Sequence, residues 1–345
     1  MVKTRICLIL LIFGVVLCGC TACKEPLQAY EKTFFVMDTV VSVQIYTGSA
    51  SKAELVFDQV LARMEALEGI LSAHLPDSDV AKLSRAAGIE AVAVNSATLA
   101  VIAESLDFGE RTGGAFDITL APVLRLYNFS PGKEQKPTQD QLGSAMPLVG
   151  WQKVELDPEA HKVYLTEKGM QIDLGGVAKG YIIDRCLDVL RENGIDFGLT
   201  NAGGDIGLLA EKPDGSPWRV GIKNPENPGT NFAIIEISQG AIATSGDYER
   251  FFIEGGKRYH HIIDPRTGMP GDKVRSATIL AGSAQLADLL STAVFVMGPE
   301  QGLAFIEELP DVEGVIWDAE GKVHWSSGLV PVQDKASVDY YFRRP

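Results

Sequence analysis

The spacing of apolar residues along the chain predicts helices mixed with short strands. Residues 53–71 carry apolar side chains three and four positions apart, which is typical of an amphipathic helix. The same spacing predicts further helices at 98–108, 179–192, 283–296 and 299–308. The polar run 77–79 suits the start of a short helix. Alternating β-branched residues predict a strand over 36–46.

Short apolar runs between turn residues predict the remaining strands. They fall at 154–156, 162–165, 197–200, 206–209, 218–222, 232–237, 241–244, 250–253, 277–280, 314–317 and 323–325. Strands that follow one another without regular helix alternation favour an α+β fold, with mixed or antiparallel sheets and packed helices, over a doubly wound parallel sheet. Residues 130–141 are rich in Pro, Gly, Lys and Gln, which predicts an exposed loop.

The N-terminal segment 1–19 has the pattern of a lipoprotein signal peptide. Two cationic residues precede the apolar stretch 6–17, which is as long as a signal-peptide core and short for a bilayer span. Leu17-Cys18-Gly19-Cys20 resembles the bacterial lipobox, so we expect cleavage before Cys20 and lipid on its thiol. A plain secretory signal and an uncleaved anchor are the alternatives. We expect a tether at 20–32, one folded domain at 33–330 and a tail at 331–345.

Composition and charge narrow the range of partners. Of 345 residues, 46% are hydrophobic and 22% are charged, as in ordinary globular proteins. The formal net charge of −14 repels nucleic acid, so we expect no nucleic-acid partner. It would also repel a phosphorylated substrate unless a metal cation, a Lys or backbone N–H groups compensate locally. Cys186 lies in an apolar helical pattern and is expected to be a small buried side chain.

The glycine-rich run 173–181 is a candidate phosphate-binding segment. Its glycines precede a predicted helix N-terminus, where backbone N–H groups and the helix dipole favour an anion. Lys179 enters the first turn and could contact phosphate, and Asp173 could accept a hydrogen bond from a ligand. The spacing is neither a Walker A motif nor a Rossmann fingerprint. A structural turn between a strand and a helix is the alternative.

Asp288 and Thr292 form a candidate magnesium site. They are four residues apart in a predicted helix and therefore share one face. A carboxylate and a hydroxyl are hard oxygen ligands, and Mg²⁺ takes few protein ligands while water and substrate phosphates complete its shell. The alternative is an ordinary helix face whose Thr bonds back to the preceding turn.

The adjacent His260 and His261 are candidates for acid–base chemistry. Neighbouring residues of a strand point to opposite faces, so only one of the two can enter a site, where it could act as a general base. The following run 264–268 has strong turn chemistry. The polar turns 113–119, 201–206 and 244–250 are structural turns or ligand contacts.

Taken in order, these segments resemble the FAD:protein FMN transferase family of ApbE-like flavin transferases. The resemblance spans residues 33–325 and rests on eight segments: Met37-Asp38-Thr39, Ser78 to Leu83, Gly114 to Asp117, Asp173 to Tyr181, Asn201 to Asp205, Thr244 to Tyr248, His261 to Pro265 and Ala287 to Thr292. It implies an α+β ApbE fold, FAD as substrate and Mg²⁺ as cofactor.

The resemblance also implies roles for single residues. Positions that contact FAD are matched by Met37, Ala115, Phe116, Asp117, Asp173, Lys179, His261 and Ile262. His74 lies where the family often has an aromatic residue near the flavin or adenine. The metal shell is matched by the Gly176 carbonyl, Asp288 and Thr292. His261 matches a residue needed for transfer.

The implied reaction cleaves FAD at its diphosphate. Mg²⁺ bridges the diphosphate, and His261 or a nearby carboxylate takes the proton of a Thr or Ser hydroxyl on an acceptor protein. The products are a phosphoester-linked FMN and AMP. The implied acceptor is an exported flavoprotein subunit, as in Rnf or sodium-pumping quinone reductase complexes. Through the lipid anchor, we expect the enzyme at the periplasmic face of the inner membrane, with the outer membrane as the alternative. An Mg²⁺-dependent FAD pyrophosphatase and a non-catalytic flavin-binding lipoprotein remain alternatives.

Overall fold

An eight-stranded sheet forms the centre of the fold. The computed structural model describes residues 26–227, 229–331 and 340–343. The sheet has the order β1-β2-β6-β7-β10-β15-β16-β17, and every neighbouring pair is antiparallel. Its strands are β1 Gln28–Val36, β2 Thr39–Thr47, β6 Gly198–Ala202, β7 Asp205–Leu208, β10 Gly240–Gly246, β15 Val274–Ala281, β16 Glu313–Asp318 and β17 Val323–Trp325.

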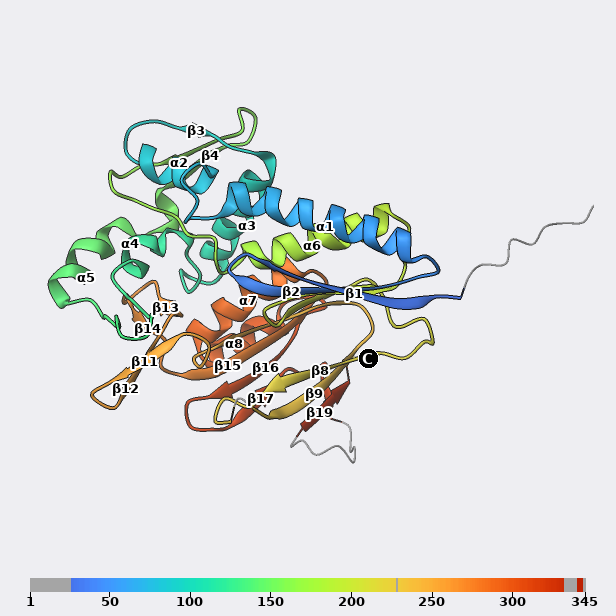
Figure 1. The fold of residues 1–345 in the computed structure, drawn as a ribbon. Coiled ribbons are helices and arrows are strands. Elements are labelled where there is room, and N and C mark those ends of the chain that lie inside the picture. The colour runs from blue at the N-terminus through green and yellow to red at the C-terminus, as the bar shows by residue number, and fades with distance from the viewer. Residues whose placement is uncertain (1–25, 228, 332–339, 344–345) are drawn as a thin grey trace, which may run out of the picture.

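Helices cover one face of this sheet and a second sheet covers the other (Figure 1). The helices that build the main core are α1 Ala50–Leu71, α3 Ser96–Arg111, α6 Ala178–Glu192, α7 Ala284–Met297 and α8 Pro299–Glu307. The second sheet has the order β18-β19-β9-β8 and contains β8 Trp218–Lys223, β9 Asn231–Ile237, β18 Val330–Pro331 and β19 Tyr340–Arg343. Since β19 runs parallel to β9, this sheet is mixed.

Smaller elements lie beside α1 and α3, on one side of the molecule (Figure 1). They are α2 Asp79–Ala86, β3 Val92–Ala93, α4 Ala121–Leu124, α5 Gln139–Ala145, β4 Val154–Asp157 and β5 Lys162–Leu165, with short 3-10 turns at Ile118–Leu120, Met146–Leu148 and Trp151–Lys153. Two further hairpins lie in the chain between β10 and β15: β11 Phe251–Glu254 with β12 Lys257–His260, and β13 Ile263–Asp264 with β14 Met269–Pro270. No helix in the described ranges is long and apolar enough to span a bilayer.

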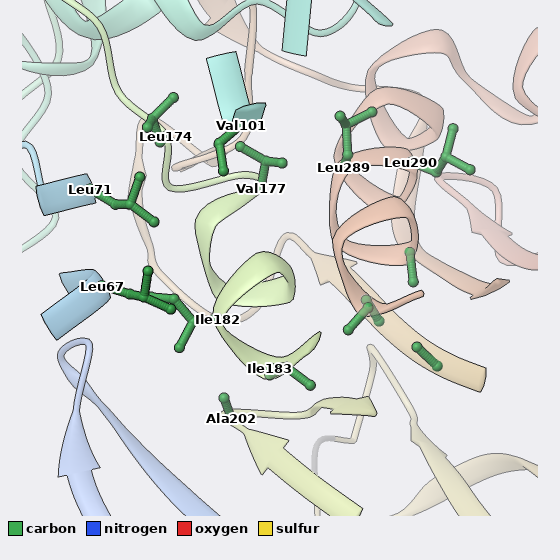
Figure 2. Packing of buried hydrophobic residues seen from close by; sticks show 14 of the residues in the cluster. Leu67, Leu71, Val101, Leu174, Val177, Ile182, Ile183, Ala202, Leu289 and Leu290 are labelled. Carbon is green, nitrogen blue, oxygen red and sulfur yellow. The ribbon is translucent and has the colours of Figure 1, made fainter. Parts of the chain in front are cut away.

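The first turns of α6 lie deep in the main core. Figure 2 shows Ile182 pointing toward Leu67 of α1, while Val177 lies toward Val101 of α3. All four side chains are buried, with at most 8% of their surface exposed. This packing fixes where the glycine-rich segment before α6 enters the core.

The α+β class and most predicted elements are confirmed. The five long helices lie within three residues of the predicted bounds at each end, and the turn at 264–268 joins β13 to β14. Cys186 is fully buried and has a free thiol, as its apolar pattern indicated. These elements have strong periodicity, which local sequence records well.

The single strand predicted at 36–46 is wrong. The segment is a hairpin in which Val36 pairs with Thr39, and Met37 and Asp38 form the turn with φ of 57° and 54°. Neither turn residue is Gly or Asn, the usual signal for this left-handed backbone, so the sequence pattern hides the turn.

The boundaries of the predicted tether and tail also differ from the structure. Strand β1 begins at Gln28, so residues 28–32 belong to the central sheet. Within the predicted tail, Tyr340–Arg343 pairs with β9. The predicted loop 130–141 ends in α5, because Thr138 and Gln141 form a capping box at Gln139. The signal peptide and Cys20 lie outside the described residues.

Candidate active site

Helices α6 and α7 cap each other where they cross. The Asp184 carboxylate of α6 accepts hydrogen bonds from Ala284 N (2.8 Å) and Gln285 N (3.0 Å), the first residues of α7. In return, Asp288 Oδ2 of α7 accepts from Gly180 N at 3.0 Å. These bonds satisfy backbone N–H groups that a helix start leaves without partners.

Only glycine fits where the two helices cross. A Cβ atom on Gly180 would lie 2.2 Å from the Ala284 carbonyl oxygen, far inside the contact distance of two such atoms. The close crossing brings the first turn of α6 directly against Asp288. Thus Gly180, the last glycine of the run 173–181, is required for packing.

Lys179 joins two buried carboxylates at this crossing. Its amine pairs with Asp205 Oδ2, the first residue of β7, and lies 3.7 Å from Asp288 Oδ1. Burial alone would lower the pKa of Lys179, but the two carboxylates outweigh it and raise the pKa above its ordinary value. Burial, partly offset by Lys179, raises the pKa of Asp288 to about 6. The lysine is therefore held as a cation.

Hydroxyl groups of α7 and β10 gather one helical turn further along α7, next to the glycine-rich loop. A Cβ on Gly176 would lie 3.4 Å from Thr292 Oγ1 and 3.2 Å from the Phe116 ring, so the glycine-rich loop lies against α7. Ser245 Oγ of β10 is 3.3 Å from Thr292 Oγ1 and 2.9 Å from Ser291 Oγ. Among the described residues, no three His, Cys, Asp or Glu side chains form a cluster that could hold a metal ion by themselves.

This donor set fits Mg²⁺ better than a transition metal. One carboxylate, one hydroxyl and a nearby backbone carbonyl offer hard oxygen atoms, and none offers nitrogen or sulfur. Asp288 keeps free lone pairs besides those that accept from Gly180 and face Lys179. Few protein ligands suit an ion that keeps water and substrate phosphates in its shell.

His261 is held by the backbone of the neighbouring strand. The backbone N–H of His261 donates to the Arg250 carbonyl at 3.1 Å, and the ring atom Nδ1 lies 3.4 Å from the same oxygen. A carbonyl only accepts, so Nδ1 carries the hydrogen and Nε2 keeps a lone pair. Burial and then the neighbouring Arg250 lower the pKa of His261 to about 3. The imidazole is a neutral acceptor at physiological pH.

His260 has a structural role instead. Its side chain is buried, its Nε2 donates to the Gly271 carbonyl at 2.7 Å, and its Nδ1 accepts from Ile262 N at 3.3 Å. The ring also makes an edge contact with Phe295. As expected for adjacent strand residues, only one of the two histidines is available for chemistry.

The flavin-contact candidates occupy segments that meet near the glycine-rich loop. Asp173 N donates to the Ile118 carbonyl at 2.8 Å, which places Asp173 beside the segment that holds Ala115, Phe116 and Asp117. Asp173 Oδ1 accepts from Gly175 N at 2.7 Å and so shapes the loop itself. The first two residues of the 115–117 segment are buried.

The hairpin that holds Met37 lies against the turn before β7. In this turn, the Gly203 N–H donates to the Val40 carbonyl at 3.1 Å, and Asp205 follows two residues later. The Met37 side chain packs at the edge of the main core. Hence the left-handed turn at Met37 lies next to the strand that supplies the partner of Lys179.

Three candidates have surroundings that the sequence did not indicate. Asp117 accepts from Thr119 N, Thr119 Oγ1 and Trp151 N, so its carboxylate ties two segments together. Ile262 is buried, and its carbonyl accepts from Gly271 N. His74 is exposed after the end of α1, and its backbone N–H donates to Ser72 Oγ at 3.2 Å.

Sequence reasoning missed Asp205 and Ser245 as members of the site. Both lie in segments that the sequence predicts to be structural turns or ligand contacts, without assigning either side chain a role. A buried Asp at the start of an otherwise apolar strand is unusual and could have signalled a cationic partner.

A surface hollow of about 550 Å³ beside α4 and α5, with Arg125 and Gln171 in its wall, does not include Lys179, His261 or Asp288.

The comparisons with known proteins agree on one family. The model described as the ApbE family matches residues 37–316. The FAD:protein FMN transferase of Treponema pallidum is 33% identical over 333 residues, which cover 91% of this chain and 92% of the relative. That of Vibrio cholerae serotype O1 is 31% identical and covers 91% of this chain and 95% of the relative.

Solved structures give the same result for the fold. The ApbE protein of Thermotoga maritima has a TM-score of 0.80 at 32% identity and covers 87% of this chain and 97% of its own. The flavin transferase ApbE from Vibrio cholerae has a TM-score of 0.78 at 30% identity, with 88% and 98% covered. With this fold, these matched segments and this site, the chain belongs to the ApbE family.

Proposed function

We propose that the protein is an FAD:protein FMN transferase, an enzyme that cleaves FAD and attaches its FMN half to a hydroxyl of another protein. The observation that carries the proposal is the crossing of α6 and α7, where Lys179, Asp288, Thr292 and the Gly176 loop meet. Relatives that bear this name match over most of the chain. In a protein of net charge −14, this crossing supplies the cation that a diphosphate needs.

Lys179 binds and orients the diphosphate in this proposal. Its amine is fixed between Asp205 and Asp288, so its position is set before substrate arrives. The first N–H groups of α6 are already paired, Ala178 N with the Leu174 carbonyl and Gly180 N with Asp288, so the Lys179 amine is the group of this turn that meets the anion. Phosphoryl transfer depends mainly on positioning and on charge stabilisation, and a preorganised cation supplies both.

His261 accepts the proton of the acceptor hydroxyl. Its Nε2 lone pair is available because Nδ1 is engaged with the Arg250 carbonyl. The hydroxyl oxygen forms a bond to the FMN phosphorus, the bridging phosphorus–oxygen bond breaks, and its electron pair leaves with AMP. The product is FMN in phosphoester linkage to a Thr or Ser.

Mg²⁺ belongs to the proposal through Asp288, Thr292 and the Gly176 carbonyl. The oxygen chemistry of this set fits the ion. When bound there, Mg²⁺ neutralises charge on the diphosphate and on the leaving group.

The acceptor and the location follow from the family resemblance and the N-terminal motif. We propose an exported flavoprotein subunit as acceptor, of the kind found in Rnf or sodium-pumping quinone reductase complexes. We also propose that lipid on Cys20 anchors the enzyme at the periplasmic face of the inner membrane. Replacing Cys20 by Ser should move the protein from the membrane fraction to the soluble fraction, and an unchanged distribution would remove the anchor.

Mass spectrometry of the acceptor distinguishes the three candidate functions, a transferase, a pyrophosphatase and a flavin-binding protein. The enzyme is incubated with FAD, Mg²⁺ and a candidate acceptor subunit, and AMP, free FMN and acceptor mass are measured together. Transfer predicts one AMP for each acceptor that gains the mass of FMN less water. AMP with an equal amount of free FMN and an unmodified acceptor would indicate a pyrophosphatase. FAD that stays intact would indicate a flavin-binding protein.

A further inference from the structure

Arg250 lies directly opposite the proposed base. Strands β11 and β12 pair Phe251 with His260, and the bond from His261 N to the Arg250 carbonyl continues this ladder by one more pair. Residues directly opposite in an antiparallel pair place their side chains on the same face, with Cβ atoms about 5 Å apart. The Arg250 and His261 side chains therefore share one side of the hairpin.

Arg250 differs from the other arginines of this region. Arg258 and Arg275 both pair with the buried Asp247, and Arg266 pairs with Asp264. The Arg250 side chain is exposed, and within the described residues no carboxylate, hydrogen-bond acceptor or aromatic ring is recorded against its guanidinium. In so acidic a protein, a cation left without a counter-ion is notable.

Arg250 and Lys179 place two cations around the proposed base. Arg250 is a leading electrostatic cause of the lowered pKa of His261, and Lys179 contributes in the same direction. Arg250 also opposes the raised pKa of Lys179, so the three groups lie within electrostatic reach of one another. The carboxylates that hold Lys179 come from β7 and α7. Within the described residues, no carboxylate is recorded against the exposed Arg250, which therefore keeps its positive charge free for an anion.

We propose that Arg250 is a further catalytic residue, whose guanidinium binds the non-bridging oxygens of the FMN phosphate while it moves from FAD to the acceptor hydroxyl. This inference rests on the proposed function. A planar guanidinium donates two parallel hydrogen bonds to phosphate and stays charged at all working pH values. It adds no atom to the reaction: the proton goes to His261 Nε2 and the electron pair leaves with AMP.

The arrangement also explains how a neutral histidine can act as a base. Without substrate, the Arg250 guanidinium beside it disfavours a proton on His261. A phosphate on Arg250 neutralises that guanidinium and places negative charge beside the imidazole, which favours the proton. Phosphate binding and proton acceptance are therefore linked, and His261 becomes a better base only when substrate is in place.

The test compares Arg250→Gln with Arg250→Lys and with Lys257→Gln in the full chain. Lys257 is exposed on the same hairpin, so its variant makes the same change in net charge away from His261. Arg250→Gln is expected to lower kcat/KM for FAD about a hundredfold, as loss of a transition-state donor does. Arg250→Lys should recover part of this loss, and Lys257→Gln should stay near wild type. Thermal unfolding identifies any variant that fails to fold.

Binding without turnover provides the second readout. Fluorescence titration measures the Kd of each variant for FAD and for riboflavin, which lacks phosphate. The inference predicts weaker FAD binding and unchanged riboflavin binding for Arg250→Gln. An equal increase in Kd for both ligands, or Kd values equal to those of Lys257→Gln, would overturn the inference. If wild type fails to transfer FMN, the proposed function fails, whereas the comparison of FAD with riboflavin still decides whether Arg250 binds phosphate.

Discussion

Asp288 of α7 accepts a hydrogen bond from the backbone N–H of Gly180 in the first turn of α6, with 3.0 Å between the nitrogen and Oδ2. The same carboxylate faces Lys179 through its other oxygen. One side chain thus caps a helix, holds a cation and is the proposed metal ligand. Because the helix crossing and the site share this residue, packing and chemistry are coupled here.

Gly180→Ala should destabilise the fold and remove activity. The added methyl would meet the Ala284 carbonyl at 2.2 Å, so α6 and α7 must separate. Overpacking of this kind costs about 1–3 kcal/mol or more. Urea unfolding gives the stability, and AMP release from FAD gives the activity.

Gly143→Ala in α5 is the matched control for this change. Gly143 is exposed, and a Cβ there meets no atom within 4 Å. Alanine should be neutral or stabilise the helix by up to about 1 kcal/mol. Equal effects of the two substitutions would show that the crossing tolerates a side chain.

Asp184→Ala should weaken the start of α7. The carboxylate accepts from two backbone N–H groups there, and loss of a capping side chain costs about 0.5–2 kcal/mol. Asp188→Ala on the same helix removes only the partly exposed ion pairs with Arg185 and Arg191, worth about 0–1 kcal/mol. Chemical denaturation should give a clearly lower free energy of unfolding for Asp184→Ala than for Asp188→Ala. The reverse order would contradict the capping role.

His261 should make stability depend on pH. Its folded pKa of about 3 lies below the ordinary value of 6.5, so between these values the unfolded chain binds more protons. The stability advantage of the neutral ring is complete above about pH 6.5 and is lost as pH falls toward 3. The unfolding free energy of wild type minus that of His261→Gln should therefore decrease between about pH 7.5 and 5. A constant difference would mean that the ring titrates normally.

Local sequence patterns predicted much of this fold, and most of the elements that they did not predict depend on pairing between segments far apart in the chain. The long amphipathic helices follow from apolar spacing, and the four-residue separation of Asp288 and Thr292 placed both on one face of α7. By contrast, the pairing of Tyr340–Arg343 with β9 joins segments about a hundred residues apart, which no local pattern encodes. The turn at Met37 and Asp38 contains no glycine that would have indicated its left-handed backbone.

The site shows the same division. The glycine-rich run predicted where Lys179 and Gly176 lie relative to a helix start. The partners of Lys179 come from β7 and α7, and only the folded chain brings Asp205 to its amine. No local pattern indicates a packing role for Gly180, whereas its closeness to Ala284 makes it a packing requirement.

AMP release from FAD by wild type and by Asp288→Asn, measured with Mg²⁺, with EDTA and after Mg²⁺ is restored, tests the central claim most directly. Asn can still accept the bond from Gly180 N, so the fold should persist, but it lacks the negative charge that makes the carboxylate the strongest Mg²⁺ ligand of this set. We predict that wild type needs Mg²⁺ and that the variant is at least about a hundredfold slower while remaining folded. Equal AMP release by both proteins, or full wild-type turnover in EDTA, would contradict the account.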